Sequence, residues 1–193
     1  IRIVDTNNDG SLTPEDRVAL GTPYPDFTWG ITNTFQIKDF DISFLIQGVQ
    51  GITVLNGDVY YNETKKWNKK YTKNRWVSAE HPGDGKTPYQ NVKTGHDLML
   101  TDYPLQNASY ACLRNFTVGY TLPATAARKI KLSGVRFYVS GSNLLYIWGS
   151  GYKGINPESR MTSGNYSSTM ISGYQRGGFP LTSTISAGFD INF

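Results

Sequence analysis

Five stretches of the chain alternate between apolar and polar residues, as β-strands do when one face lies in an apolar medium and the other in water. The clearest case is 181–193, where the odd positions are mainly apolar and the even positions are Thr, Ser, Gly, Asp or Asn. The same period of two runs through 27–38, 39–48, 108–121 and 133–147. We therefore expect an all-β fold built from antiparallel strands.

The alternation also assigns individual side chains to the two faces. In 108–121 it places Tyr110 and Cys112 on the apolar face, together with Phe116 and Val118. In the last stretch it places Asp190 on the polar face. Cys112 is the single cysteine, which excludes a disulfide framework. On an apolar face we expect it to act as a small hydrophobic residue.

The lengths of the strands and of their connections favour a membrane barrel. Each stretch has ten or more residues, and a tilted strand needs about 9–11 residues to cross a bilayer. Short connections alternate with long ones, as in outer-membrane barrels, whose short turns face the periplasm. This predicts periplasmic turns at 38–39 and 122–132, the second with some helical character. It predicts extracellular segments at 1–26, 49–107 and 148–181.

The strands predicted within 27–193 are too few to close a barrel, which needs at least about eight. Open edges would also leave unpaired backbone groups in hydrocarbon. The residues from Ile1 onward form neither the basic nor the apolar region of a signal peptide. We therefore expect the chain to be a C-terminal piece of a larger protein. No run approaches about 18 apolar residues, which excludes a membrane-spanning helix.

Residues 5–16 (DTNNDGSLTPED) follow the spacing of an EF-hand-type calcium loop. A hard cation needs several oxygen ligands, and alternate residues of a tight loop supply them. Gly10 stands where the turn needs a positive φ. The predicted ligands are Asp5, Asn7, Asp9, Ser11 through its carbonyl, and Asp16, which replaces the usual Glu as in dockerin-type loops. The alternative is an Asn/Asp-Gly turn without metal.

The net charge of +4 comes from a local basic stretch. Residues 62–76 hold six of the nineteen Lys and Arg, interleaved with aromatic residues. Such a stretch could bind nucleic acid, lipid phosphates or an acidic protein. A solvated loop is an equal alternative, because charge runs usually face water. We predict no nucleic-acid partner.

Four blocks of the chain resemble the C-terminal part of a SusC/RagA-type TonB-dependent outer-membrane transporter of Bacteroidetes. They are 5–48, 107–123 (NASYACLRNFTVGYTLP), 135–159 and 179–193. Two positions depart from the family pattern: Asn156 stands where Asp is usual, and Cys112 adds one residue to the Ser-Tyr-x-Arg spacing. The resemblance implies the C-terminal segment of a barrel of about 22 strands, which imports oligosaccharides or peptides.

The resemblance also implies partners for the whole protein. These are a SusD-type surface lipoprotein, the TonB complex through an N-terminal part absent from this chain, the barrel-assembly machinery and outer-membrane lipid. The assembly machinery would bind the last strand at Phe189, Ile191 and Phe193 by strand addition. The alternative is that these side chains only face lipid.

Other functional classes are less well supported by the residues. No catalytic constellation is present, since His81 and His96 are isolated, so an enzyme is not expected. No substrate-binding residue can be chosen among the aromatic residues of 49–107. Two alternatives to the transporter remain: a soluble calcium-stabilised β-sandwich binding module, and a small enzyme on a β-scaffold. Detergent dependence separates the transporter from the first of these.

Overall fold

The structure is a computed structural model, and it describes residues 4–58, 74–89, 101–159 and 173–193. The chain divides into two compact units. The sheet unit consists of Pro25–Gly51, Ser109–Ser150 and Phe179–Phe193. The loop unit consists of Ile1–Tyr24, Ile52–Ala108 and Gly151–Gly178.

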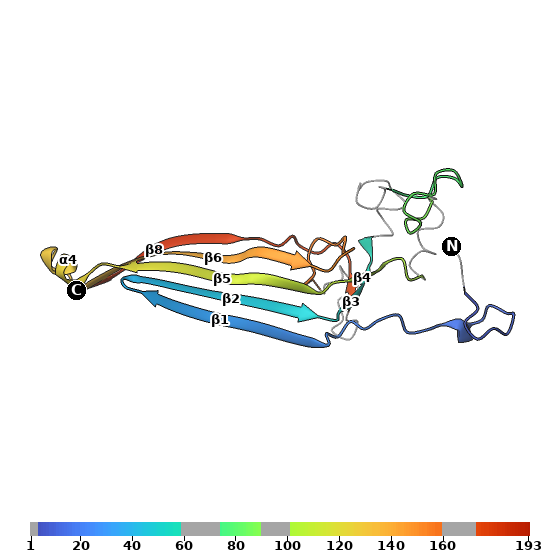
Figure 1. The fold of residues 1–193 in the computed structure, drawn as a ribbon, viewed down its shortest axis with the longest axis horizontal. Coiled ribbons are helices and arrows are strands. Elements are labelled where there is room, and N and C mark those ends of the chain that lie inside the picture. The colour runs from blue at the N-terminus through green and yellow to red at the C-terminus, as the bar shows by residue number, and fades with distance from the viewer. Residues whose placement is uncertain (1–3, 59–73, 90–100, 160–172) are drawn as a thin grey trace. The chain divides into compact units, whose positions relative to one another are not determined.

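The sheet unit is one antiparallel sheet of five strands in the order β1-β2-β5-β6-β8 (Figure 1). The strands are β1 (Phe27–Ile37), β2 (Phe40–Gln50), β5 (Tyr110–Thr121), β6 (Gly134–Trp148) and β8 (Thr184–Asn192). Each strand lies beside the next of these in the chain, as in a meander. All five predicted strands are present, with their ends shifted by at most three residues.

Two short connections join strands at the same end of the sheet. Residues 38 and 39 form a two-residue turn between the paired residues Ile37 and Phe40, and Lys38 has a φ of 54°. The helix α4 (Ala124–Lys129) follows β5, contacts β6 and buries Ala127. The predicted tight turn and the helical character of 122–132 are both confirmed. We call this end of the sheet the turn end.

The register separates an apolar face from a polar face, because side chains of cross-strand partners lie on the same side of a sheet. One apolar row runs Phe40, Tyr120, Phe137, Phe189 across four strands. A polar row runs Ser43, Thr117, Ser140, Ser186. The five strands contain only four charged residues, and all four belong to the polar face: Asp41, Arg114, Arg136 and Asp190.

The predicted face of Tyr110 and Cys112 is wrong, because β5 contains a bulge. The register shifts between Leu113 and Asn115, so Arg114 is an extra residue. An extra residue moves everything beyond it to the other face. Cys112 therefore pairs with Gln47 and Tyr146 on the polar face, where it is only 1% exposed.

The loop unit contains a small second sheet that alternation did not predict. Its order is β4-β3-β7, formed by β3 (Thr53–Asn56), β4 (Leu105–Asn107) and β7 (Tyr174–Gln175). Ile52, Val54 and Ala108 are buried in this unit. A single 3-10 turn, η1 (Pro14–Asp16), lies near the N-terminus. Within the described residues, no helix is long and apolar enough to cross a membrane.

Candidate functional site

The apolar face of the large sheet exposes bulky side chains over most of its length. Apolar side chains of β1, β2, β6 and β8 on this face are roughly half exposed or more. They are Ile31, Phe35, Ile37, Phe40, Phe137, Val139, Leu145, Ile147, Ile185 and Phe189. None of the charged residues of the five strands lies on this face. An uncharged apolar surface of this size is unfavourable in water and marks contact with lipid or with another protein.

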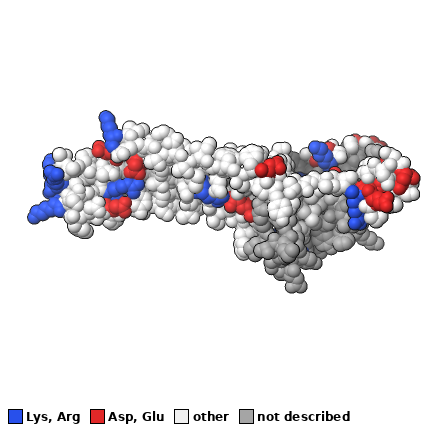
Figure 2. All heavy atoms as spheres, turned by 90° about the horizontal axis from the view of Figure 1, so that it is seen from below, with Lys and Arg blue, Asp and Glu red and all other residues white. Residues whose placement is uncertain are grey.

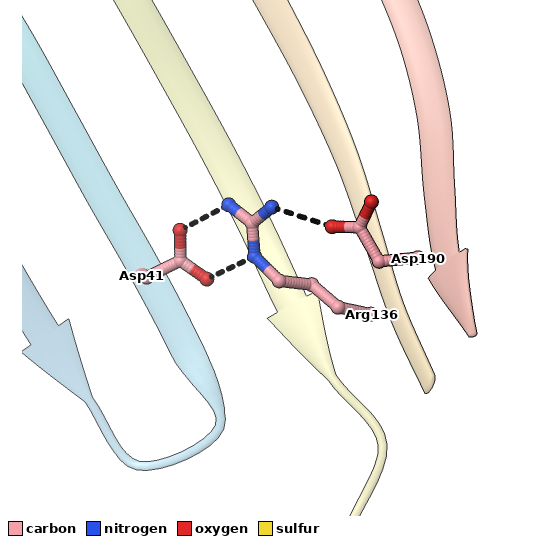
Figure 3. Close-up of polar contacts among 3 residues, drawn as sticks. All are labelled: Asp41, Arg136 and Asp190. Carbon is pink, nitrogen blue, oxygen red and sulfur yellow. Dashed lines mark hydrogen bonds and ion pairs between the residues drawn. The ribbon is translucent and has the colours of Figure 1, made fainter. Parts of the chain in front are cut away.

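The polar face carries a charged cluster near the turn end, shown in Figure 3. Arg136 donates from Nε to Asp41 Oδ1 at 3.0 Å and from Nη2 to Asp41 Oδ2 at 2.6 Å. Its Nη1 donates to Asp190 Oδ2 at 3.3 Å. The guanidinium also lies 5.2 Å from the centroid of the Tyr138 ring. These contacts tie β6 to both β2 and β8, and they give Asp190 the polar-face position that alternation predicts.

The cluster depends on a missing side chain at Gly119. Asp41 and Arg136 reach each other across β5, which lies between their strands, and Gly119 is the cross-strand partner of Asp41. A Cβ added to Gly119 would collide with the Asp41 carboxylate and the Arg136 guanidinium. A two-point pair of this kind fixes both distance and orientation. Glycine at 119 therefore leaves the space for a side-chain bridge over a central strand.

A second arginine, in β5, joins the two strands on either side of it. Arg114, the extra residue of β5, donates from Nε to Gln47 at 3.1 Å. Its Nη1 donates to Asn143 Oδ1 at 2.8 Å and to the Tyr146 hydroxyl at 2.9 Å. Asn143 has a φ of 54°, at the point where β6 is also irregular. The side chain re-aimed by the bulge thus holds β2 and β6 together on the polar face.

The predicted calcium loop is tightly organised by its own side chains. Asp5 accepts the backbone N–H groups of Asn8 at 2.7 Å and Gly10 at 2.8 Å. Asn7 accepts the N–H of Asp9 at 3.0 Å, and Asp9 accepts that of Ser11 at 2.7 Å. Gly10 has a φ of 82°, as the predicted turn requires. These local hydrogen bonds give the loop a defined turn structure.

Asp16 closes the loop on itself. One of its carboxylate oxygens accepts the N–H of Thr6 at 2.8 Å, and the other accepts the N–H of Thr13 at 2.8 Å. The bonds from Thr13 and Thr6 hold the pKa of Asp16 below its ordinary value of 3.8. In the described part of the chain, no three His, Cys, Asp or Glu side chains form a metal-ligating group. The chemistry of the oxygens fits a hard cation, while hydrogen bonds alone also hold the loop closed.

The last strand lies at an edge of the sheet. Among the described residues β8 pairs with β6 and with no second strand. Phe189, Ile191 and Phe193 are 65%, 39% and 96% exposed. The Ser133 hydroxyl donates to the carbonyl of Phe193 at 2.9 Å. An exposed edge with apolar side chains at alternate positions is the form that strand addition requires.

A buried polar network in the loop unit was not predicted. Asn56 donates to Gln106 at 3.0 Å, and Gln106 also accepts the N–H of Lys153 at 2.9 Å. The Tyr152 hydroxyl donates to Gln175 at 2.7 Å. Asn56, Gln106 and Gln175 are all buried, so the bonds offset the cost of burying their amides. Single amides in long connections form no pattern by which a sequence would reveal them.

Some of the residues singled out in the sequence lie outside the described residues. This applies to 62–73 of the basic stretch and to His96. His81 is described, and its N–H donates to the Ser78 carbonyl at 3.0 Å in a local turn. No substrate-contacting residue follows from these positions.

Curated proteins that are similar in sequence over nearly the whole chain are TonB-dependent receptors. TonB-dependent receptors P26 and P3 of Formosa agariphila are 30% and 31% identical to it, and each match covers 98% of this chain. TonB-dependent receptor SusC of Bacteroides thetaiotaomicron is 26% identical over 98% of the chain. These matches cover 19%, 18% and 17% of the respective receptors. The chain thus spans about a fifth of the length of the curated relatives it matches. No family model matches it.

Solved structures show the same fold. The RagAB peptide importer in its closed-closed state aligns with a TM-score of 0.64 and 21% identity, over 91% of this chain and 18% of that one. The open-open state gives 0.61 and 22% identity over 88% of this chain and 17% of that one. The arrangement of the strands is therefore that of a segment of such an importer.

Proposed function

We propose that this chain, which is similar to TonB-dependent receptors over nearly its whole length, is the C-terminal part of a SusC/RagA-type receptor and forms the last five strands of a transmembrane barrel. The barrel lies in the outer membrane of a Gram-negative bacterium and imports a nutrient. This proposal rests above all on one observation: an apolar face without charged residues lies opposite a polar face that carries all four charges of the strands. That is the distribution expected of a strand with lipid on one side and a lumen on the other.

The two edges of the sheet support the same proposal. Within the described residues, β1 pairs with β2 alone and β8 with β6 alone. Unpaired N–H and C=O groups in hydrocarbon are very costly, so membrane sheets close into barrels. We propose that β1 and β8 pair with further strands of the full receptor, in a barrel of about 22 strands. A soluble sandwich is less favoured, because the only other sheet in the described residues has strands of two to four residues.

We propose that the turn end faces the periplasm and that the long connections face outward. The loop unit would then contribute to the extracellular mouth. Its buried amide network gives these connections a fixed local structure. The full receptor would take up oligosaccharides or peptides, work with a SusD-type lipoprotein outside, and draw energy from TonB through its missing N-terminal part. The RagAB peptide importer is a structural precedent for peptide uptake by a protein of this fold.

Two further roles for residues of this chain accompany the proposal. First, Asp5, Asn7, Asp9, Ser11 and Asp16 bind a structural calcium ion, supported by the spacing of their oxygen-bearing side chains and by the positive φ of Gly10. Second, Phe189, Ile191 and Phe193 are bound by the barrel-assembly machinery, supported by the edge position of β8, which pairs with β6 alone within the described residues. Both roles are structural and involve no catalysis.

The proposal is tested on the full-length protein in its native membrane. The outer-membrane fraction is extracted in detergent, and intact polypeptides that contain peptides of this chain are sized by mass spectrometry. We expect a polypeptide about five times longer than this chain, as in its relatives, co-purified with a lipoprotein. A soluble polypeptide of 21.5 kDa that needs no detergent would contradict the proposal.

A further inference from the structure

Four basic side chains gather at the turn end of the large sheet. Lys38 lies in the turn between β1 and β2, Arg128 and Lys129 end helix α4, and Lys131 follows that helix. Figure 2 shows Lys and Arg spheres gathered at the end of the sheet that carries α4. All four residues are exposed. We call this group the basic rim.

The charge of the basic rim is not compensated within the described residues. None of its members forms an ion pair there. Asp39 is the one acidic residue in the same turns, while Asp41 and Asp190 are engaged with Arg136 on the polar face. The rim therefore carries a net side-chain charge of about +3 at neutral pH. A concentrated positive charge of this kind attracts an anionic partner.

An aromatic row lies directly beside the basic rim. Phe40 follows Lys38 by two residues, and its ring centroid is 4.8 Å from that of Tyr120. The row continues through Phe137 and Phe189 on the exposed apolar face. Aromatic side chains collect at the boundary between hydrocarbon and head groups. Basic residues one step further out would then lie at the level of the head groups.

From this juxtaposition we propose that the basic rim binds acidic phospholipids of the leaflet at the turn end, with acyl chains against the aromatic row. The proposal rests on the membrane function proposed above. The positive charge of the basic rim favours an acidic head group. The adjoining aromatic row favours a lipid over a soluble anion, because it can contact acyl chains. Each basic side chain near an anionic surface accounts for about 1 kcal/mol, or about a fivefold change in affinity. Loss of two of them is expected to weaken the preference about 25-fold.

The test uses the purified full-length receptor in detergent with equal amounts of phosphatidylglycerol and phosphatidylcholine. Native mass spectrometry gives the ratio of the two bound lipids. We expect the unmodified receptor to prefer phosphatidylglycerol, and the Arg128→Gln/Lys131→Gln variant to lose about 25-fold of that preference. The matched control is Arg17→Gln/Lys86→Gln, which removes one Arg and one Lys from exposed sites in the loop unit. It is expected to keep the preference.

Three results would overturn the proposal. They are an unchanged preference in Arg128→Gln/Lys131→Gln, an equal loss in the control, and displacement of phosphatidylglycerol by inorganic phosphate. If the first variant does not fold, Lys38→Gln/Lys129→Gln gives the same test with the same expected loss. A receptor that folds in detergent but shows no lipid preference contradicts this inference alone. A protein that needs no detergent contradicts the proposed function as well.

Discussion

Arg136 and Asp41 form a two-point ion pair across the width of β5, directly over Gly119. Their strands are not neighbours, so the pair joins elements that backbone hydrogen bonds do not connect. With Asp190 on the far side, one guanidinium links β2, β6 and β8. We infer that the cluster holds the last strands of the barrel in a common register at the turn end.

The first prediction concerns Gly119→Ala in the full receptor. The new methyl group displaces Asp41 from Arg136, and we expect a loss of about 1–2 kcal/mol in the free energy of unfolding, because the pair is charged but partly exposed. The free energy of unfolding is measured in a urea titration, in which the folded fraction is read from the heat-dependent gel mobility of the barrel.

Gly30→Ala is the matched control for that substitution. Gly30 also lies on the polar face, and a Cβ there would have its nearest neighbour, the Ile46 carbonyl oxygen, at 3.8 Å. We expect no loss of stability at this site. Equal stabilities of the two variants would show that the pair over Gly119 does not matter for the barrel.

The second prediction concerns pH and the loop closed by Asp16. The folded-state pKa of Asp16 is lowered below 3.8, so the charged form stabilises the loop. This stabilisation is present above about pH 3.8 and is lost as the pH falls through the lowered pKa. Hydrogen exchange of the peptide 5–17, corrected for the intrinsic pH dependence, is expected to show loss of protection at Thr6 and Thr13 in that range. An Asp16→Ala variant that keeps the protection at neutral pH would contradict the assignment.

The third prediction concerns calcium. We expect the full receptor to bind Ca²⁺ at 5–16 with a Kd on the order of 10⁻⁴ to 10⁻³ M, the range of extracellular sites. Binding should increase hydrogen-exchange protection of this loop, and Asp9→Ala should remove the effect. Asp39→Ala, which removes an exposed carboxylate from a turn of the sheet unit, serves as the control. Identical exchange in calcium and in chelator would leave the loop as a turn held by hydrogen bonds alone.

The fourth prediction concerns assembly of the barrel. Phe193→Ala removes an almost fully exposed aromatic ring at the end of the chain. We expect less folded receptor in the outer membrane, because strand addition by the assembly machinery uses alternate apolar side chains. Immunoblots of unheated outer-membrane samples measure the folded fraction. Phe179→Ala, which removes another highly exposed ring outside β8, is expected to leave it unchanged.

The strands were predictable because alternation depends on the two media that the sheet separates. In β6 alternation places Phe137 and Val139 on one face and Arg136 and Tyr138 on the other. The observed register gives the same two faces. The face of Cys112 was not predictable in the same way. Arg114 is polar in either register, so alternation does not show that it is the extra residue of a bulge. The added residue in the Ser-Tyr-x-Arg spacing was a sign of the irregularity, but it did not say which residue leaves the register.

The cluster around Arg136 was only half predictable. Alternation places Asp41, Arg136 and Asp190 on one face, but contact between β2 and β6 requires the strand order and the empty position at Gly119. The loop unit was less accessible still. In its small sheet Leu55 pairs with Leu105 and with Tyr174, which lie 50 and 119 positions further along the chain. Its stability depends on buried amides whose partners are fixed only by the fold.

The central claim is that one face of this sheet contacts lipid and the other does not. The most direct test places a nitroxide label at Val139 or Ser140 in the full receptor in bilayers, through Val139→Cys or Ser140→Cys on a Cys112→Ser background. We expect the label at 139 to be accessible to oxygen dissolved in the lipid and protected from a water-soluble nickel complex. The label at 140 should be shielded from lipid oxygen. Equal accessibility of both labels to the nickel complex would contradict the account.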